Sequence, residues 1–108
     1  MILINGRRKK VFFSIITVTK NSHLTLEKCI NSVFKQTFTN FEHIIIDGGS
    51  NSKKINIIKK NSKKISYAIS EKDKNLWHAI NKGIKASRGK VICILNSDDI
   101  FFKNALKI

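Results

Sequence analysis

Apolar runs that stop abruptly at polar residues are the main feature of this chain. Four such runs are rich in β-branched residues, as expected of strands buried in a parallel sheet. They cover residues 12–19, 41–46, 65–70 and 90–95. Apolar residues at helical spacing predict a helix between each pair of successive runs. The resulting β-α-β-α-β-α-β order predicts an α/β fold with a parallel sheet and right-handed crossovers.

The three predicted helices differ in the apolar surface that they offer. The apolar positions of the first are Leu26, Cys29, Ile30, Val33 and Phe34. The second, over about residues 52–61, buries little, and the strand after it is expected near a sheet edge. In the third, Leu76, Ile80 and Ile84 form one stripe, and Gly89 is the expected C-terminal glycine. Right-handed crossovers place the first two helices on one face of the sheet and the third on the other.

Polar clusters follow the first, second and fourth predicted strands, at residues 17–21, 47–50 and 96–99. The carboxyl ends of parallel strands share one edge, where open α/β sheets bind ligands. The last cluster ends in Asp98 and Asp99. Two carboxylates about 4 Å apart repel by roughly 4 kcal/mol at an effective dielectric near 20, so a divalent cation or a raised pKa would relieve them. A solvated turn is the alternative for one cluster alone, whereas three clusters together favour a binding site.

Length and composition predict one globular domain over residues 1–108, with residues 1–11 as a basic N-terminal extension. No apolar run approaches the roughly 20 residues that cross a bilayer. The short apolar start precedes basic residues, the reverse of a secretory signal, so we expect a cytoplasmic protein. Cys29 and Cys93 lack metal-ligand spacing and are expected to be buried thiols.

The net charge of +14 raises the question of an anionic partner. The basic residues are spread along the chain, and the densest group is Lys53, Lys54, Lys59, Lys60, Lys63 and Lys64. A solvated face is favoured over a binding patch for such a group. No aromatic residues alternate with these lysines, which argues against base stacking and so against nucleic acid. Peripheral contact with an anionic membrane, at its inner face, remains an open alternative.

Five stretches carry a family resemblance: SIITVTKN (14–21), SVFKQTF (32–38), FEHIIIDGGS (41–50), SEKDKNLWHAINKGI (70–84) and ASRGKVICILNSDD (86–99). With these motifs the chain resembles the nucleotide-sugar-binding N-terminal half of family 2 glycosyltransferases with the GT-A fold, especially bacterial enzymes that build surface polysaccharides. The resemblance implies a truncated GT-A fold, with a four-stranded parallel Rossmann-like sheet in the order 3-2-1-4. It also implies binding of a nucleoside-diphosphate sugar, with a UDP-sugar favoured, for transfer to a cell-surface polysaccharide or similar acceptor.

The resemblance also implies roles for single residues. Asp47 would accept a hydrogen bond from the base, and Asp73 would lie near the ribose and diphosphate. Asp99 would be the first choice for a Mg²⁺ or Mn²⁺ ligand, with Asp98 as a second ligand or a sugar contact. The metal would neutralise charge on the departing nucleoside diphosphate. The implied nucleotide-sugar residues are Thr17, Val18, Asn21, Asp47, Gly48, Ser50, Asp73, Asn81, Lys82 and Asp98.

Several positions depart from the family pattern, among them Asn96, where an acid is frequent, and residues 52–54, where an acidic, glycine-containing continuation is usual. Three more lie in the motif of the third helix. Lys72 stands where proline is expected, Asn75 where glycine is, and His78 where aspartate is usual. Asn75 can still adopt a left-handed conformation. No catalytic residue is assigned, because the base expected of inverting members belongs to the acceptor-binding half; His78 and Asp99 are weak substitutes.

Three functional hypotheses follow. The first is the donor half of a metal-dependent glycosyltransferase, and the second is an inactive nucleotide-sugar-binding remnant of a truncated gene. The third is a small basic nucleic-acid-binding protein. Without an acceptor half, one face of the sheet is expected to be half bare, which predicts a homo-oligomer, a separate acceptor-half chain or marginal stability. A receiver domain is disfavoured because its acid pair should follow the first strand.

Overall fold

The computed structural model describes residues 2–6, 10–20, 23–49 and 52–97. Within them the chain forms β1 (Ile2–Asn5), β2 (Phe13–Thr19), α1 (His23–Phe34), β3 (Phe41–Asp47), α2 (Ser52–Lys60), the 3₁₀ helix η1 (Ser62–Lys64), β4 (Tyr67–Ser70), α3 (Leu76–Ala86) and β5 (Val91–Ile94). The strands form one sheet in the order β1-β4-β3-β2-β5. No helix in these ranges is long and apolar enough to cross a bilayer.

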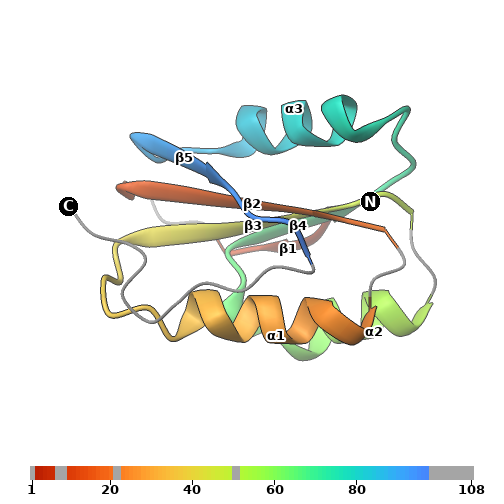
Figure 1. The fold of residues 1–108 in the computed structure, drawn as a ribbon, viewed down its shortest axis with the longest axis horizontal. Helices are drawn as coiled ribbons and strands as arrows, with labels where there is room; N and C mark the ends of the chain where they lie inside the picture. The colour runs from red at the N-terminus through yellow and green to blue at the C-terminus, as the bar shows by residue number, and fades with distance from the viewer. Residues whose placement is uncertain (1, 7–9, 21–22, 50–51, 98–108) are drawn as a thin grey trace.

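The four parallel strands lie in the predicted order. β2 pairs in parallel with β3 and β5, and β3 pairs in parallel with β4. The α/β fold and the order 3-2-1-4 are therefore confirmed. Helices α1 and α2 cover one face of the sheet and α3 covers the other, as predicted from the crossovers (Figure 1).

A further strand, β1, extends the sheet beyond β4 and pairs with it in the antiparallel direction. Next to it, the backbone N–H of Gly6 donates to the carbonyl of Ser66 at 2.8 Å. Leu3 and Ile4 pack beside the apolar cluster under α1. The third predicted strand, β4, therefore lies near the edge of the sheet as expected, one strand in from it, because a short apolar run within residues 1–11 pairs along it.

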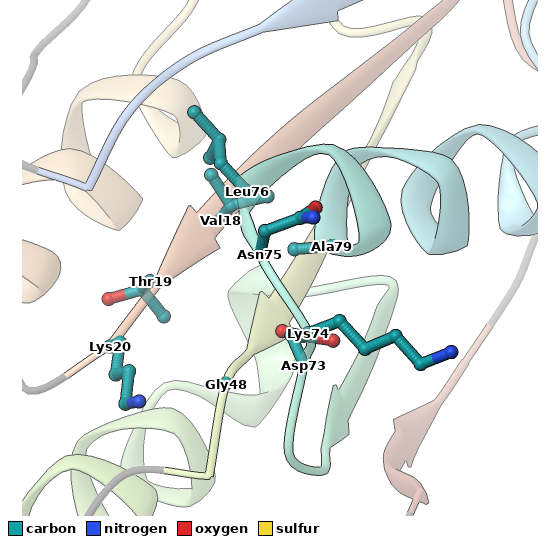
Figure 2. Close-up of a pocket in the computed structure, with 9 residues that line it drawn as sticks. All are labelled: Val18, Thr19, Lys20, Gly48, Asp73, Lys74, Asn75, Leu76 and Ala79. Carbon is teal, nitrogen blue, oxygen red and sulfur yellow. The ribbon is translucent and has the colours of Figure 1, made fainter.

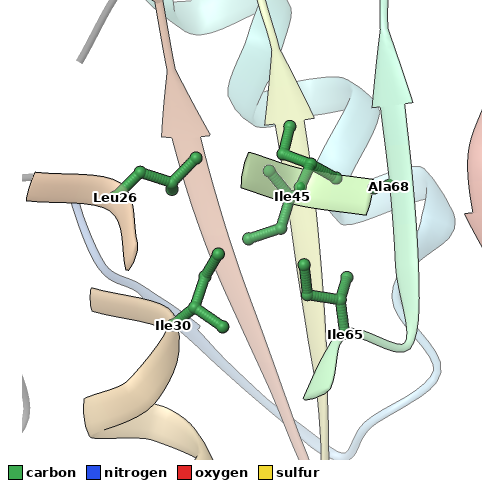
Figure 3. Packing of buried hydrophobic residues seen from close by; sticks show 6 residues of the cluster. Leu26, Ile30, Ile45, Ile65 and Ala68 are labelled. Atoms are coloured by element: carbon green, nitrogen blue, oxygen red, sulfur yellow. The ribbon is translucent and has the colours of Figure 1, made fainter. Parts of the chain in front are cut away.

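An apolar layer fills the space between α1, α2 and the sheet. Its buried members are Leu26, Ile30, Ile45, Ile58, Ile65 and Ala68. Figure 3 shows Leu26 and Ile30 of α1 reaching toward the strands that carry Ile45 and Ala68. Burying one such aliphatic side chain stabilises the fold by about 1.5–3 kcal/mol. Phe34, predicted in the same stripe, is instead 54% exposed, because it is the last residue of α1.

Helix α3 packs on the other face through small residues. Its buried residues are Ala79 and Gly83, and a Cβ on Gly83 would collide with the Ile16 side chain. Of the predicted stripe, Ile80 packs against the core, whereas the prediction is wrong for Leu76 and Ile84, which are 56% and 42% exposed. The small side chains of Ala79 and Gly83 allow α3 to approach the sheet closely. The larger apolar residues Leu76 and Ile84 therefore lie on the side of the helix, away from the sheet.

The connection from α3 to β5 is anchored by a buried acid. Glu42 Oε2 accepts hydrogen bonds from Ser14 Oγ and from Arg88 N, each at 2.6 Å. Gly89 N donates to Ser14 Oγ at 2.7 Å, and a Cβ on Gly89 would lie 2.6 Å from Ser14 N. The helix itself ends with Ser87 as its extended C-cap. Gly89 is therefore not the C-terminal glycine of the helix, but allows close approach to β2.

Candidate functional site

A pocket opens at the carboxyl edge of the sheet. It encloses about 310 Å³ and is lined by Val18, Thr19, Lys20, Gly48, Asp73, Lys74, Asn75, Leu76 and Ala79. Figure 2 shows that these residues come from the end of β2, the turn after β3, the loop that leads into α3 and the start of α3 itself. Small-molecule sites are typically concave and about 300–1,000 Å³ in volume, so the pocket is large enough for part of a nucleotide-sized ligand.

Two glycines shape the turn after β3. The backbone N–H of Gly48 donates to the carbonyl of Thr19 at 2.9 Å, which joins this turn to the end of β2. A Cβ on Gly48 would lie 3.3 Å from Asp73 Oδ2, closer than an ordinary contact. Gly49 has a φ of 85°, a conformation that glycine adopts without strain. The turn therefore brings its backbone close to Asp73 at the pocket wall.

Lys82 holds two acids of the loop between β4 and α3. Its Nζ lies 2.8 Å from Glu71 Oε1 and also donates to Asp73 Oδ1. Burial would lower the pKa of Lys82, but hydrogen bonds to Asp73 and Glu71 outweigh it and raise that pKa. The hydrogen bond from Lys82 also lowers the pKa of Glu71. The side chains of Lys82 and Asp73 are only 17% and 10% exposed, so Lys82 fixes the position of the Asp73 carboxylate.

Asn75 and His78 organise the start of α3. Asn75 is extended, with a φ of −167°, and not left-handed; its side chain accepts a hydrogen bond from His78 N at 2.9 Å. His78 Nδ1 accepts a hydrogen bond from Lys74 N at 3.0 Å and lies 3.8 Å from Asp73 Oδ1. The contact with Lys74 N is the shorter of the two, and in it Nδ1 acts as the acceptor.

A chain of buried polar groups lies on the α1 side of the sheet. Thr17 Oγ1 lies 2.8 Å from His43 Nε2 and 3.8 Å from Cys29 Sγ. Cys29 Sγ donates in turn to the carbonyl of Asn96 at 3.7 Å. Burial lowers the pKa of His43 to about 3, so its ring is neutral near pH 7. These contacts connect β3 through α1 to the segment after β5.

The predicted nucleotide-sugar residues lie in different settings. Val18, Gly48 and Asp73 line the pocket. Thr17 and Asp47 are fully buried and do not line it.

Asp47 Oδ2 accepts a hydrogen bond from Ser70 Oγ at 2.7 Å, beneath the turn that carries Gly48. Asn81 is exposed on α3, and Lys82 meets the pocket wall through Asp73. The predicted residues Asn21, Ser50, Asp98 and Asp99 lie outside the described ranges. Their roles in binding stay predictions.

The sequence pattern did not predict Lys20 and Lys74, which line the pocket. Two cationic side chains at one pocket suit an anionic ligand. Lys20 belongs to the polar cluster after the first strand, so its position could have indicated it. Lys74 belongs to a charged loop that offered no such signal, because its neighbours are charged as well.

The described residues contain no group of three His, Cys, Asp or Glu side chains placed to bind a metal ion. The predicted ligands Asp98 and Asp99 follow β5 in the sequence, outside those residues. β5 runs parallel to β2, and Leu95 N donates to the carbonyl of Ile16 at 2.9 Å. The described part of the chain after β5 therefore leads toward the pocket edge of the sheet.

Comparison with known proteins gives a consistent set of relatives. A family model described as glycosyl transferase family 2 matches residues 14–108. An uncharacterized glycosyltransferase of Rickettsia bellii is 42% identical over 96 residues, which covers 87% of this chain and 14% of the relative. WfgD of Escherichia coli, named a UDP-Glc:alpha-D-GlcNAc-diphosphoundecaprenol beta-1,3-glucosyltransferase, is 31% identical over 88% of this chain and 38% of its own. The chain thus spans well under half the length of these relatives.

Solved structures share the fold. Residues 1–349 of S. aureus TarS in complex with UDP give a TM-score of 0.77 and 28% identity, over 87% of this chain and 29% of the solved TarS chain. The complex of the same TarS residues with UDP-GlcNAc gives a TM-score of 0.76, with 26% identity over 88% and 28% of the two chains. A mannosyltransferase from Pyrobaculum calidifontis, in complex with GDP-Man and Mn²⁺, has a TM-score of 0.76 at 14% identity, over 91% and 31%, a likeness of fold alone.

Proposed function

This chain belongs to glycosyl transferase family 2, and on that premise we propose that its pocket binds the nucleoside-diphosphate sugar that serves as donor in sugar transfer. The observation that carries the proposal is the position of the pocket. It opens at the carboxyl edge of the parallel sheet, where α/β folds bind ligands, and its lining includes Val18, Gly48 and Asp73, which the motifs single out.

A UDP-sugar is the donor that we propose. TarS was solved with UDP and with UDP-GlcNAc, and the name of WfgD specifies UDP-Glc. Two relatives that differ in sequence thus share a uridine nucleotide, which supports the same base for this chain.

Within the pocket, Asp73 is proposed to accept hydrogen bonds from the ribose. Lys82 holds its Oδ1, and its Oδ2 faces Gly48. Lys20 and Lys74 are proposed to balance the charge of the diphosphate, because both line the pocket. The base contact expected of Asp47 would need access to a fully buried carboxylate, so we propose that Asp47 supports the Gly48 turn instead.

Asp98 and Asp99 are proposed to hold Mg²⁺ or Mn²⁺ beside the diphosphate. Carboxylate oxygens are the hard ligands that both ions prefer. The Mn²⁺ complex of the P. calidifontis mannosyltransferase, a relative in fold, supports a divalent ion. When bound, the ion would act as a Lewis acid that neutralises charge on the leaving nucleoside diphosphate.

Transfer to a saccharide acceptor, in the synthesis of a surface polysaccharide or a similar product, is proposed for the whole enzyme. The chain covers only 14% and 38% of the two curated relatives described above. WfgD is named for a GlcNAc-bearing lipid diphosphate acceptor, which supports a saccharide acceptor. We assign no catalytic base among the described residues.

Calorimetric titration with UDP, with and without Mn²⁺, tests the donor site. We expect UDP to bind, more tightly with Mn²⁺, and Asp73→Asn to lose about tenfold or more in affinity. Lys28→Ala, on the exposed surface of α1, is the matched control and should bind like the parent. Unchanged affinity in Asp73→Asn, or no binding to the folded chain, would contradict the proposal. Asp99→Ala should lose the Mn²⁺ effect, which tests the metal separately.

A further inference from the structure

A basic surface lies where α1, α2 and η1 end. It is defined here by Lys59, Lys60, Lys63, Lys64 and the exposed ring of Phe34. Two adjoining hollows shape it. One, of about 480 Å³, is lined in part by Lys60, Lys63 and Lys64. The other, of about 310 Å³, is lined in part by Phe34, Lys63 and Lys64. Because the hollows share two lysines, the surface is continuous.

Lys64 is held in the middle of this basic surface. Its Nζ donates to Asn31 Oδ1 at 2.7 Å and lies 5.5 Å from the centre of the Phe34 ring. Lys60 lies 3.6 Å from Glu27, which is the one acid among the residues lining the two hollows. Three lysines against one carboxylate leave the lining positive.

The basic surface and the donor pocket lie at opposite ends of the sheet. Phe41 and Ser66, at the amino ends of β3 and β4, line the basic hollow, whereas Gly48 and Asp73, beyond their carboxyl ends, line the donor pocket. The seven residues of β3 separate the two by roughly 20 Å. In Figure 1, α1 runs back along the sheet from the end of β2 toward the start of β3, and Phe34 is its last residue.

We propose that the basic surface docks on an anionic phospholipid bilayer, with the donor pocket turned away from it. Charge complementarity is the first reason, because each lysine near an anionic bilayer strengthens binding by about fivefold. Phe34 is the second, because an exposed aromatic ring among lysines can enter the headgroup region.

Nucleic acid fits the same surface less well. Single strands need several aromatic rings for base stacking, and base reading favours the two-pronged guanidinium of arginine. The basic surface, as defined by its described residues, offers lysines and one exposed ring. It can therefore supply charge and an apolar anchor, but not a stacking platform.

Cosedimentation of the chain with vesicles tests the proposal. We expect binding to phosphatidylcholine vesicles that contain phosphatidylserine, weakened by salt, and none to phosphatidylcholine alone. Lys59→Glu/Lys63→Glu should lower the affinity by about 25-fold or more, from two lysines at about fivefold each. Lys53→Glu/Lys85→Glu is the matched control. The control changes the net charge by the same amount. Lys53 is exposed at the pocket end of α2, and Lys85 is exposed on α3, on the opposite face of the sheet, so the control should lose far less affinity for the vesicles. Phe34→Ser should weaken binding several-fold at high salt.

Equal losses in the two double variants would overturn the proposal, because overall charge and not this surface would then bind lipid. So would a failure to bind phosphatidylserine vesicles, or stronger binding to a DNA duplex that the same two lysines govern. Circular dichroism checks that each variant is folded. If Lys59→Glu/Lys63→Glu does not fold, Lys59→Ala/Lys63→Ala takes its place in the binding assay. UDP affinity should be equal with and without vesicles. A chain that binds no UDP would count against the donor site alone, since lipid binding is measured without nucleotide.

Discussion

The ammonium group of Lys82 and the carboxylate of Asp73 form an ion pair that joins the second turn of α3 to the loop at the pocket wall. Lys82 was predicted as a residue that binds the nucleotide sugar. In the structure it contacts Glu71 and Asp73, two acids of the chain itself, and its role in binding stays a prediction. Its most direct contribution is therefore to place Asp73.

Removing the Lys82 charge should damage both stability and the pocket. Lys82→Met leaves Asp73 largely buried without its cation, and the loss of a hydrogen bond to a charged group costs about 1.5–3 kcal/mol. Lys82→Arg should restore part of this, and Lys85→Met, exposed on the same helix, should change stability by less than about 0.5 kcal/mol. Urea denaturation measures stability, and UDP titration measures the pocket. Equal behaviour of Lys82→Met and Lys85→Met would show that the ion pair contributes nothing.

The pKa of Lys82 is raised by folding. The contribution of Lys82 to stability should therefore be full below pH 10.5 and be lost as the pH rises through the pKa of the folded state.

Acid should destabilise the fold through His43. Burial lowers its pKa from 6.5 to about 3, so the unfolded chain binds a proton between these values while the folded chain does not. Stability should therefore fall as the pH drops below about 6.5, at up to roughly 1.4 kcal/mol per unit. In His43→Gln, which cannot titrate, the slope of stability against pH between 6.5 and 5 should be clearly smaller. Urea midpoints across this range provide the measurement, and identical slopes would refute the assignment.

Gly83→Ala should destabilise the chain, against the usual trend for helices. Alanine in place of a helix-interior glycine normally stabilises by about 0.5–1 kcal/mol. Here the added Cβ would meet Ile16, and such overpacking costs about 1–3 kcal/mol. Gly6→Ala is the control, because the nearest atom to its added Cβ is Ser66 O at 4.0 Å. The unfolding temperatures of the two variants, compared with that of the parent, test this prediction. A higher unfolding temperature for Gly83→Ala would mean that α3 does not pack as closely as described.

Glu42 should matter far more than the surface acid Glu27. Glu42→Leu removes the acceptor that Ser14 Oγ and Arg88 N share. Arg88 N still has Ser14 Oγ at 3.2 Å, so the cost comes mainly from the buried Ser14 hydroxyl, at about 1–3 kcal/mol for a buried group left unsatisfied. Glu27→Gln removes an ion pair with the exposed Lys60 and keeps a side-chain oxygen that can accept from Asn61 Nδ2, so it should have a small effect. Hydrogen exchange of the α3–β5 connection should also accelerate in Glu42→Leu. Equal denaturation midpoints for the two variants would contradict the anchoring role.

The parallel core of the fold could be predicted from the sequence because its strands are continuous β-branched runs, such as residues 41–46. Crossover handedness then fixed which helices share a face. The packing of α3 could not be predicted in this way, because Ala79 and Gly83 carry little hydrophobic signal while Leu76 and Ile84 carry much. β1 was missed because four residues are too few to show a period and their partner strand is distant in sequence.

The candidate site could be predicted only to the level of segments. Topology predicted that residues 17–21, 47–50 and 96–99 meet at one edge, and the pocket lining includes Lys20 and Gly48 from the first two of these clusters. Asp73, which also lines the pocket, was implied by the family resemblance and not by topology. Topology could not say on which side of a strand end a side chain falls. Thr17 therefore contacts His43 inside the core, and Asp47 contacts Ser70, while Lys20 and Lys74 reach the pocket.

The chain has one tryptophan, Trp77, which is 71% exposed and directly follows the pocket-lining Leu76. Its fluorescence therefore comes from a single known place at the start of α3. A water-exposed indole emits at long wavelength, so any molecule that covers this flank of the helix should shift the emission to shorter wavelength. The chain thus carries its own optical reporter for whatever arrives beside the pocket, and needs no added label.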